Sequence, residues 1–141
     1  MSADTPPTET GGNLPPVEEE SIYLPPVEEE SIYHLLKPEV PEHGDGCAVL
    51  RFTPEPIWTI GAGVVQGGIV TAMLDMAMAF ASNGLSTATI TVDILRPATG
   101  RLTATGEGTK MGRRLLFAAG ELHNDDGCLV AIGNQTAIPP G

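Results

Sequence analysis

The sequence contains little positive charge. Only 7 of its 141 residues are Lys or Arg, whereas 18 are Asp or Glu, and the formal net charge is −11. Nucleic acids and anionic membranes bind proteins through basic surfaces, so the overall charge argues against both as partners. A chain of this length is expected to form one domain with its own hydrophobic core.

Cysteine and histidine are also scarce. Cys47 and Cys128 are far apart in the sequence and form no Cys-x-x-Cys motif, so we expect two reduced thiols in a cytoplasmic protein. The three histidines, His34, His43 and His123, lack the spacing of metal ligands. We therefore predict no metal site and no bound cofactor.

No apolar segment is long enough to cross a membrane. The longest one, Ile69–Ala81, reads IVTAMLDMAMAFA, whereas a membrane-spanning helix needs about 20 apolar residues. The first ten residues, MSADTPPTET, have neither the basic nor the apolar region of a signal peptide. These features predict a soluble protein located in the cytoplasm.

The acidic residues are concentrated near the N-terminus. Residues 1–33 contain eight Asp or Glu and no Lys or Arg, which accounts for −8 of the net charge of −11. Within them the sequence LPPVEEESIY occurs twice in succession, at Leu14–Tyr23 and Leu24–Tyr33. Pro pairs and Glu triplets favour extended chain. We therefore assign residues 1–33 to an acidic tail and residues 34–141 to a globular domain.

One long helix is predicted over Gly67–Ser82. Its composition is almost entirely apolar, which is typical of a helix buried on all sides. Asn83-Gly84 tolerate positive φ and are expected to end it. Asp75 is the only charged residue in this helix. Because burying an unpaired charge is costly, such a carboxylate is expected to be paired, protonated or used in chemistry.

The segments around this helix predict a sheet. Pro38, Pro41 and Gly44 indicate a loop. Alternating or β-branched segments then predict five strands, over Cys47–Thr53, Thr87–Leu95, Arg101–Thr109, Arg114–Asn124 and Cys128–Ile138. Short links between the last four favour an antiparallel meander. The predicted class is α+β, with a curved antiparallel sheet wrapped around the helix.

Several short motifs occur in a specific order along the chain. Gly63-Val64-Val65-Gln66-Gly67-Gly68 leads into the helix that carries Asp75, and Thr87–Leu95 runs into Arg96-Pro97-Ala98. Later motifs are Leu102-Thr103-Ala104, Gly112-Arg113-Arg114 and Asp126-Gly127-Cys128-Leu129-Val130-Ala131. Over roughly residues 45–138 this order resembles the hotdog-fold acyl-CoA thioesterases. The resemblance is to the PaaI-like, phenylacetate-pathway type within the 4-hydroxybenzoyl-CoA thioesterase superfamily.

The resemblance implies a hotdog fold that assembles as a homodimer or a dimer of dimers. It also implies that the protein hydrolyses an acyl-CoA thioester. In it the backbone N–H of Gly67 would polarise the thioester carbonyl, and Asp75 would be the acidic catalytic residue, with Thr87 close by. Two positions depart from the family. Gln66 stands where most members have His, and Ile60 stands where many have Asn. Gln66 can still donate a hydrogen bond to a carbonyl oxygen.

The residues themselves suit this chemistry. Thioester hydrolysis needs a donor for the oxyanion, and a base or a nucleophile for the carbonyl carbon. Gly67-Gly68 at a helix start would offer free N–H groups and close approach, although these glycines could instead serve only tight packing. Asp75 could act as general base or as nucleophile, or could be a structural carboxylate.

The spacing of these residues predicts an oligomer. Gly67 and Asp75 are eight residues apart on one helix, about 12 Å at 1.5 Å per residue. That separation is too large for both to act on one carbonyl. We therefore predict a dimer in which Asp75 of one subunit faces Gly67 of the other.

Other side chains are candidates for supporting roles. Thr87 is expected to hydrogen-bond the Asp75 carboxylate or a catalytic water. Thr91 and Asp93 lie at alternate positions from Thr87, so they share its face unless a bulge intervenes. Arg and Lys suit the phosphate groups of coenzyme A, so substrate binding is assigned to Gly68, Lys110, Arg113 and Arg114, with ordinary surface charge as the alternative.

Two other functions stay open. The departures at Gln66 and Ile60 are compatible with a non-catalytic hotdog module that has an acyl-CoA binding or regulatory role. The repeat could also recruit a partner through its tyrosines, because Ser31-x-Tyr33-x-x-Leu36 resembles a tyrosine phosphorylation motif.

Overall fold

The computed structural model describes residues 30–140. It divides into two units between Lys37 and Pro38. The first contains the short helix α1 (Ile32–Leu36), and the second contains every strand and the long helix α2 (Gly67–Ser82). The first copy of the repeat and most of the second lie outside the described residues. The boundary between residues 33 and 34 therefore stays a prediction.

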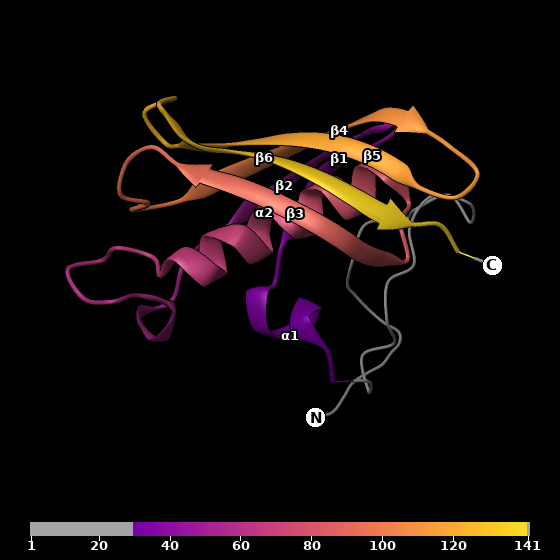
Figure 1. The fold of residues 1–141 in the computed structure, drawn as a ribbon. Coiled ribbons are helices and arrows are strands. Elements are labelled where there is room, and N and C mark those ends of the chain that lie inside the picture. Colours follow the sequence, from indigo (N-terminus) through magenta and orange to yellow (C-terminus); the bar gives the residue numbers. More distant parts are fainter. Residues whose placement is uncertain (1–29, 141) are drawn as a thin grey trace. The chain divides into compact units, whose positions relative to one another are not determined.

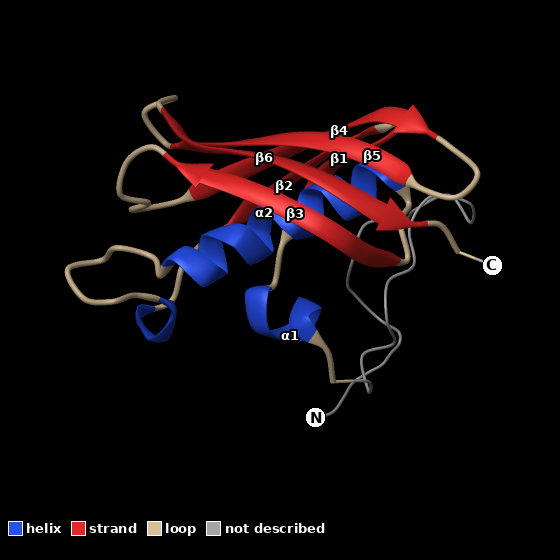
Figure 2. Ribbon diagram, viewed as in Figure 1, coloured by secondary structure: helices blue, strands red, loops and turns tan. Residues whose placement is uncertain are grey.

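Six antiparallel strands form one sheet in the order β1-β2-β4-β5-β6-β3 (Figure 1). Their bounds are β1 Glu39–Gly44, β2 Cys47–Phe52, β3 Ser86–Ile94, β4 Leu102–Met111, β5 Leu116–Asn124 and β6 Leu129–Ile138. A 3-10 turn, η1 (Pro56–Trp58), precedes α2. Figure 2 shows the strands lying along one side of α2. The predicted α+β class is confirmed, and the five predicted strands correspond to β2–β6.

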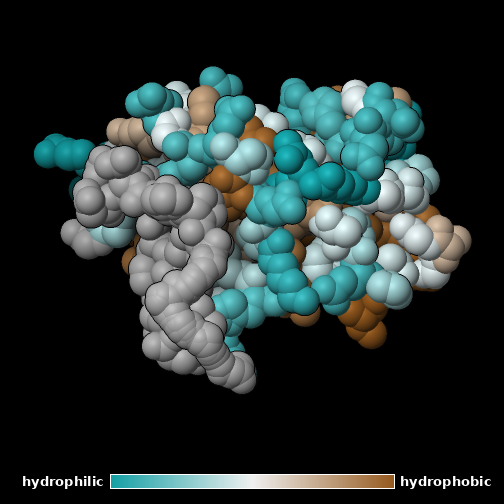
Figure 3. All heavy atoms as spheres, turned by 180° about the vertical axis from the view of Figure 1, so that it is seen from behind, coloured by the Kyte–Doolittle hydropathy of each residue, from teal (hydrophilic) through white to brown (hydrophobic). Residues whose placement is uncertain are grey.

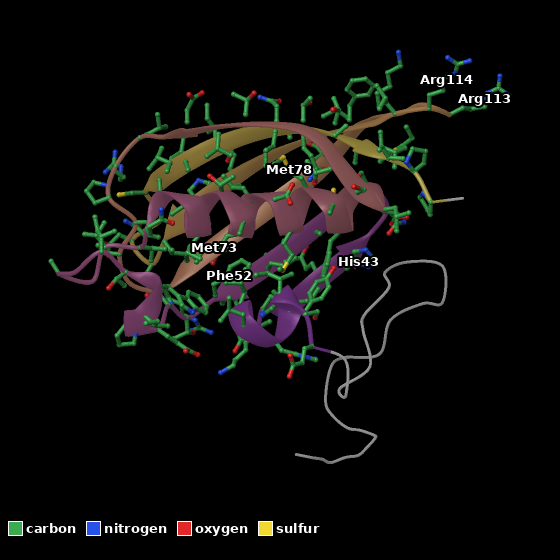
Figure 4. The ribbon with its side chains drawn as sticks, turned by 60° about the horizontal axis from the view of Figure 1, so that its bottom comes forward. His43, Phe52, Met73, Met78, Arg113 and Arg114 are labelled. Carbon is green, nitrogen blue, oxygen red and sulfur yellow. The ribbon has the colours of Figure 1, made fainter. Side chains whose placement is uncertain are left out.

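Helix α2 begins and ends where the sequence predicts. Gln66 is its N-cap, and Asn83 ends it in the left-handed conformation with φ 59°. Met73 and Met78 of α2 and Phe52 of β2 are fully buried and belong to the core (Figure 4). Among the described residues, no helix has the length and apolar character needed to cross a membrane.

A row of glycines lets α2 lie close to the sheet. Gly106 of β4 pairs with Gly120 of β5, which in turn pairs with Gly133 of β6. A methyl group on Gly106 would overlap the carbonyl oxygen of Ala77, and one on Gly120 would lie 3.1 Å from Met78 Cγ. The absence of side chains along this row therefore sets the distance between the helix and the sheet.

The first strand corrects the predicted loop at Pro38, Pro41 and Gly44. The segment Glu39–Gly44 is β1, which pairs with β2 and forms one edge of the sheet among the described residues. Its pairing register shifts between Glu39 and Glu42, so Pro41, which has no N–H to donate, falls at an irregularity. His43 Nε2 also donates to the Phe80 carbonyl oxygen of α2 at 3.0 Å. Tertiary contacts therefore overrode the local turn signals.

The order of the strands corrects the predicted four-stranded meander. Strands β4, β5 and β6 form a meander, but β3 pairs with β6 at the far edge of the sheet. Reaching β4 from β3 means crossing three strand spacings, about 14 Å. The link of residues 95–101 can span about 23 Å when extended. A short connection was therefore compatible with a crossover as well as with a hairpin.

Candidate functional site

The start of α2 offers two free backbone donors. Within the described residues, the N–H groups of Gly67 and Gly68 donate to no acceptor. The N–H of Gln66, by contrast, donates to the Trp58 carbonyl oxygen at 2.9 Å. Unpaired N–H groups and the helix dipole together create a positive potential at this end of the helix.

The side chain of Gln66 caps the same helix. Its Oε1 accepts a hydrogen bond from the Ile69 N–H at 3.1 Å, so its Nε2 is the atom that stays available to donate to a ligand. Gly68 makes room for this arrangement, because a Cβ atom there would lie 2.8 Å from Gln66 Oε1. Gly68 thus supports the cap as well as exposing its own N–H.

Replacing Gln66 tests the cap. We expect Gln66→Ala to lower the free energy of unfolding by about 1 kcal/mol, because the Ile69 N–H loses its side-chain acceptor. Gln66→Asn should keep most of this stability, since Asn is a favourable N-cap residue. Urea denaturation of the two variants and the parent protein measures the difference. Equal stability of Gln66→Ala and the parent would contradict a stabilising cap.

Asp75 lies in the middle of α2 and is held from two strands. The Thr87 hydroxyl of β3 donates to Asp75 Oδ1 at 2.7 Å, and Gln135 Nε2 of β6 donates to the same oxygen at 2.7 Å. Gln135 Nε2 also lies 3.0 Å from the Asp75 carbonyl oxygen and 3.3 Å from Thr87 Oγ1. The three side chains form one connected network around a single carboxylate oxygen.

The second oxygen of Asp75 is left free. Within the described residues, Oδ2 accepts no hydrogen bond. It is also not a buried atom, because it is absent from the buried polar atoms that lack a partner. Asp75 itself is half-buried. One carboxylate oxygen is therefore anchored, and the other is open to a water molecule or a substrate.

A β-bulge directs Thr87 toward Asp75. Thr87 pairs with Ala137 and Thr89 pairs with Thr136, so Ala88 has no partner across the strand pair. The extra residue reverses which side chains face the helix beyond this point. Bulges of this kind are common beside active sites, where they re-aim a side chain.

The same bulge removes two candidates from the face of Thr87. Beyond it, Ile90 pairs with the buried Gln135, whereas Thr91 and Asp93 are exposed on the opposite face. Thr91 and Asp93 therefore do not join the network. Thr91 and Asp93 were predicted to share the face of Thr87 unless a bulge intervened, and β3 contains such a bulge.

Gln135 also belongs to the network, and no motif in the sequence marks it. It is 3% exposed, on the inward face of β6. The available signal was alternation. Ala131, Gly133 and Ala137 occupy the same inward positions, so Gln135 is the one polar side chain in a row of small residues that faces the helix.

Asp75 lies on a half-buried stripe of α2. Ala72, Asp75 and Ala79 share one face of the helix at three- and four-residue spacing, and all three are half-buried, whereas their neighbours Leu74 and Met76 are buried. The prediction of a helix buried on all sides is therefore wrong for this stripe, because the sheet covers only part of the helix.

Solved structures share this architecture. The Escherichia coli PaaI protein from the phenylacetic acid degradation operon is 26% identical, with a TM-score of 0.73 over 81% of this chain and 87% of its own. A putative thioesterase from Ralstonia eutropha, related to phenylacetic acid degradation, is 27% identical, with a TM-score of 0.71 over 81% and 92% of the two chains. A mutant of PaaI from Thermus thermophilus is 26% identical, with a TM-score of 0.70 over 77% and 98%.

The chain is a hotdog protein of the thioesterase superfamily. It is structurally close to the PaaI phenylacetic acid degradation proteins. No family model matches its sequence, and a comparison with curated proteins finds no match. The family resemblance and the hotdog fold expected from the motifs are thus confirmed by structure.

The candidate phosphate-binding side chains of this hotdog protein lie away from the start of α2 in the same chain. Strand β4 passes Ala77 at Gly106 and Ala81 at Gly108, so it runs toward the C-terminal end of the helix. Arg113 and Arg114 lie in the middle of the β4–β5 connection, beyond the end of β4, where Figure 4 shows them pointing outward. One chain therefore does not bring them together with Gly67 and Gly68.

The loop before α2 presents apolar side chains. Ile60 is 72% exposed and Ile57 is 83% exposed, and Figure 3 shows that hydrophobic side chains reach the surface between hydrophilic ones. Gly61, Ala62 and Gly63 all have positive φ, which makes the tip of this loop a tight turn. Ile60 thus occupies an open position near the helix start, where it cannot supply the amide that Asn would offer.

Proposed function

We propose that this hotdog protein is an acyl-CoA thioesterase that hydrolyses a thioester to a free acid and coenzyme A. The observation that carries the proposal is the state of the Asp75 carboxylate: two donors anchor Oδ1, and Oδ2 accepts no hydrogen bond from residues 30–140. An anchored carboxylate with one open oxygen is suited to proton abstraction from water or to attack on a carbonyl carbon.

The helix start supplies the complementary group. The Gly67 N–H would donate to the thioester oxygen, where negative charge grows as the carbonyl carbon is attacked. The adjacent Gly68 N–H and Gln66 Nε2 are further donors for orienting the substrate. Because these donors belong to a helix end and its cap, they need little rearrangement during the reaction.

The site is proposed to be shared between two subunits. Gly67 and Asp75 lie about 12 Å apart along α2, so one chain cannot direct both at one carbonyl. A second copy would fit on the half-buried stripe that contains Asp75 and on the outer edge of β3, which pairs with no other strand of residues 30–140. In a two-fold dimer, Asp75 of one subunit would face Gly67 of the other in two equivalent sites.

The substrate is proposed to be an acyl thioester of coenzyme A. The structural relatives include PaaI proteins from phenylacetic acid degradation and a putative thioesterase. The exposed cations Lys110, Arg113 and Arg114 form no ion pair within the described residues, which leaves them available for phosphate groups.

A panel of acyl-CoA thioesters tests this function. Release of free thiol would be followed with a chromogenic disulfide reagent for aliphatic and aromatic acyl groups. Catalytic release from at least one member is expected. Binding of acyl-CoA without release across the panel would instead support the second candidate, a non-catalytic acyl-CoA module, which the apolar Ile60 in the loop before α2 favours.

Removing one backbone donor tests the role of Gly67. Gly67→Pro deletes the N–H at the first position of α2, where proline is well tolerated. The preceding residue is already extended, with φ −63° and ψ 142° at Gln66, as a residue before proline must be. We expect kcat/KM for the best thioester to fall by about 10²- to 10³-fold, with the fold retained.

The control for this variant is Gly67→Ala. It keeps the N–H, and its Cβ would lie at an ordinary contact distance of 3.5 Å from Ile94 Cδ1. It should therefore lose less activity than Gly67→Pro. An equal loss in the two variants would indicate steric exclusion of the substrate rather than loss of the donor.

A further inference from the structure

Gln135 makes contacts that a packing role does not require. It is 3% exposed, and its Nε2 lies within 2.7 Å of Asp75 Oδ1 and 3.0 Å of the Asp75 carbonyl oxygen. A carbonyl oxygen and a carboxylate oxygen can only accept hydrogen bonds, so the Gln135 atom between them must be the amide nitrogen. One amide group therefore bridges the backbone and the side chain of the same residue.

The rest of the Gln135 amide is left unsatisfied. Its Oε1 is buried and has no hydrogen-bond partner within the described residues. A buried polar atom without a partner costs free energy, and an apolar side chain of the same length would avoid that cost. Stability alone therefore gives no reason for an amide at this position, whereas a requirement to hold Asp75 does.

We infer that Gln135 is a positioning residue that acts through Asp75. By bridging Oδ1 and the backbone carbonyl, it sets the side-chain torsions of Asp75, and with Thr87 it directs Oδ2 toward the open side of the helix. The inference rests on the proposed thioesterase function and adds to it a residue from β6. Gln135 itself would touch neither the substrate nor the attacking water.

Two substitutions separate positioning from packing. Gln135→Met keeps the length of the side chain and removes both donors, so kcat is expected to fall by about 10- to 100-fold through misplacement of Oδ2, with KM changed by less than about threefold. Gln135→Glu places an acceptor against two acceptors and should lower kcat further. Asn134→Asp makes the same chemical change at an exposed neighbour on the same strand and should leave kcat unchanged.

A double-mutant cycle provides a readout that a merely structural role would not move. In a chain that already carries Asp75→Asn, adding Gln135→Met should not lower the residual rate further, because Gln135 acts only through the Asp75 carboxylate. Melting temperatures of all variants are recorded alongside. A kcat of Gln135→Met equal to that of Asn134→Asp, or a further loss in the Asp75→Asn background, would overturn the inference. Should Gln135→Glu fail to fold, Gln135→Met alone decides.

One measurement is independent of turnover. The side-chain amide protons of Gln135, observed by nuclear magnetic resonance, are expected to exchange slowly with water in the parent protein and to shift and lose protection in Asp75→Ala. Unchanged signals would refute the contact, and with it the inference. If the parent protein releases thiol, and Asp75→Asn does not, while the Gln135 variants keep the parent kcat, then the positioning role alone is refuted and the thioesterase function stands.

Discussion

Asp75→Asn is expected to lower kcat for thioester hydrolysis by about 10²- to 10⁴-fold, which is the range attributed to a general base. The asparagine oxygen can still accept hydrogen bonds from Thr87 and Gln135, as Asp75 Oδ1 does. Its NH₂ group then takes the place of Oδ2, and it can neither accept a proton nor attack a carbonyl carbon. Thiol release at saturating acyl-CoA measures the effect.

The matched control for this variant is Asp93→Asn. This substitution makes the same chemical change, from carboxylate to amide, on the outer face of β3. Asp93 is exposed there and lies outside the Asp75 network. Its kcat should equal that of the parent protein. An Asp75→Asn chain that keeps the parent rate would remove the carboxylate from the mechanism, even if the protein is a thioesterase.

Mixing two inactive variants is expected to restore activity. A chain with Asp75→Asn keeps Gly67, and a chain with Gly67→Pro keeps Asp75, so a mixed dimer contains one shared site with both intact groups and one with neither. Random association makes half of the dimers mixed, and activity should return to about a quarter of the parent value per subunit. Each variant alone should stay near background.

The two chains would carry different affinity tags, so that the mixed dimers can be isolated after co-expression. Activity that follows the doubly tagged fraction supports a shared site. Doubly tagged dimers as inactive as the two single variants would place Asp75 and Gly67 in one chain's site and would contradict the composite arrangement. A monomeric and active parent protein at assay concentration would contradict it as well.

Helix α2 illustrates what local sequence could predict. Its bounds, Gly67–Ser82, follow from an apolar run between a polar cap and Asn83-Gly84. The isolated charge in that run marked Asp75, and the glycines beside Gln66 marked the free donors. These features depend on residues within a few positions of one another, so they could be read without knowing the fold.

Strand β1 and the Asp75 network illustrate what could not be predicted. Pro41 reads as a loop residue, yet pairing with β2 and the His43 contact to Phe80 make its segment a strand. Gln135 is 60 residues from Asp75 along the chain, and only the packing of β6, beside β3, against α2 brings it there. No local pattern indicates which strand will be the neighbour of another.

The sequence by itself determined the central helix, the positions of five strands, the helix-start donors and the charge at Asp75, because short-range periodicity and capping specify these features. Only the tertiary structure decided that β3 pairs with β6, that a bulge at Ala88 aims Thr87 inward, and that Gln135 holds one oxygen of Asp75 while the other has no partner in the part of the chain that the structure describes. These features depend on strand order and register, which are set by long-range packing of the sheet against α2 rather than by any segment alone.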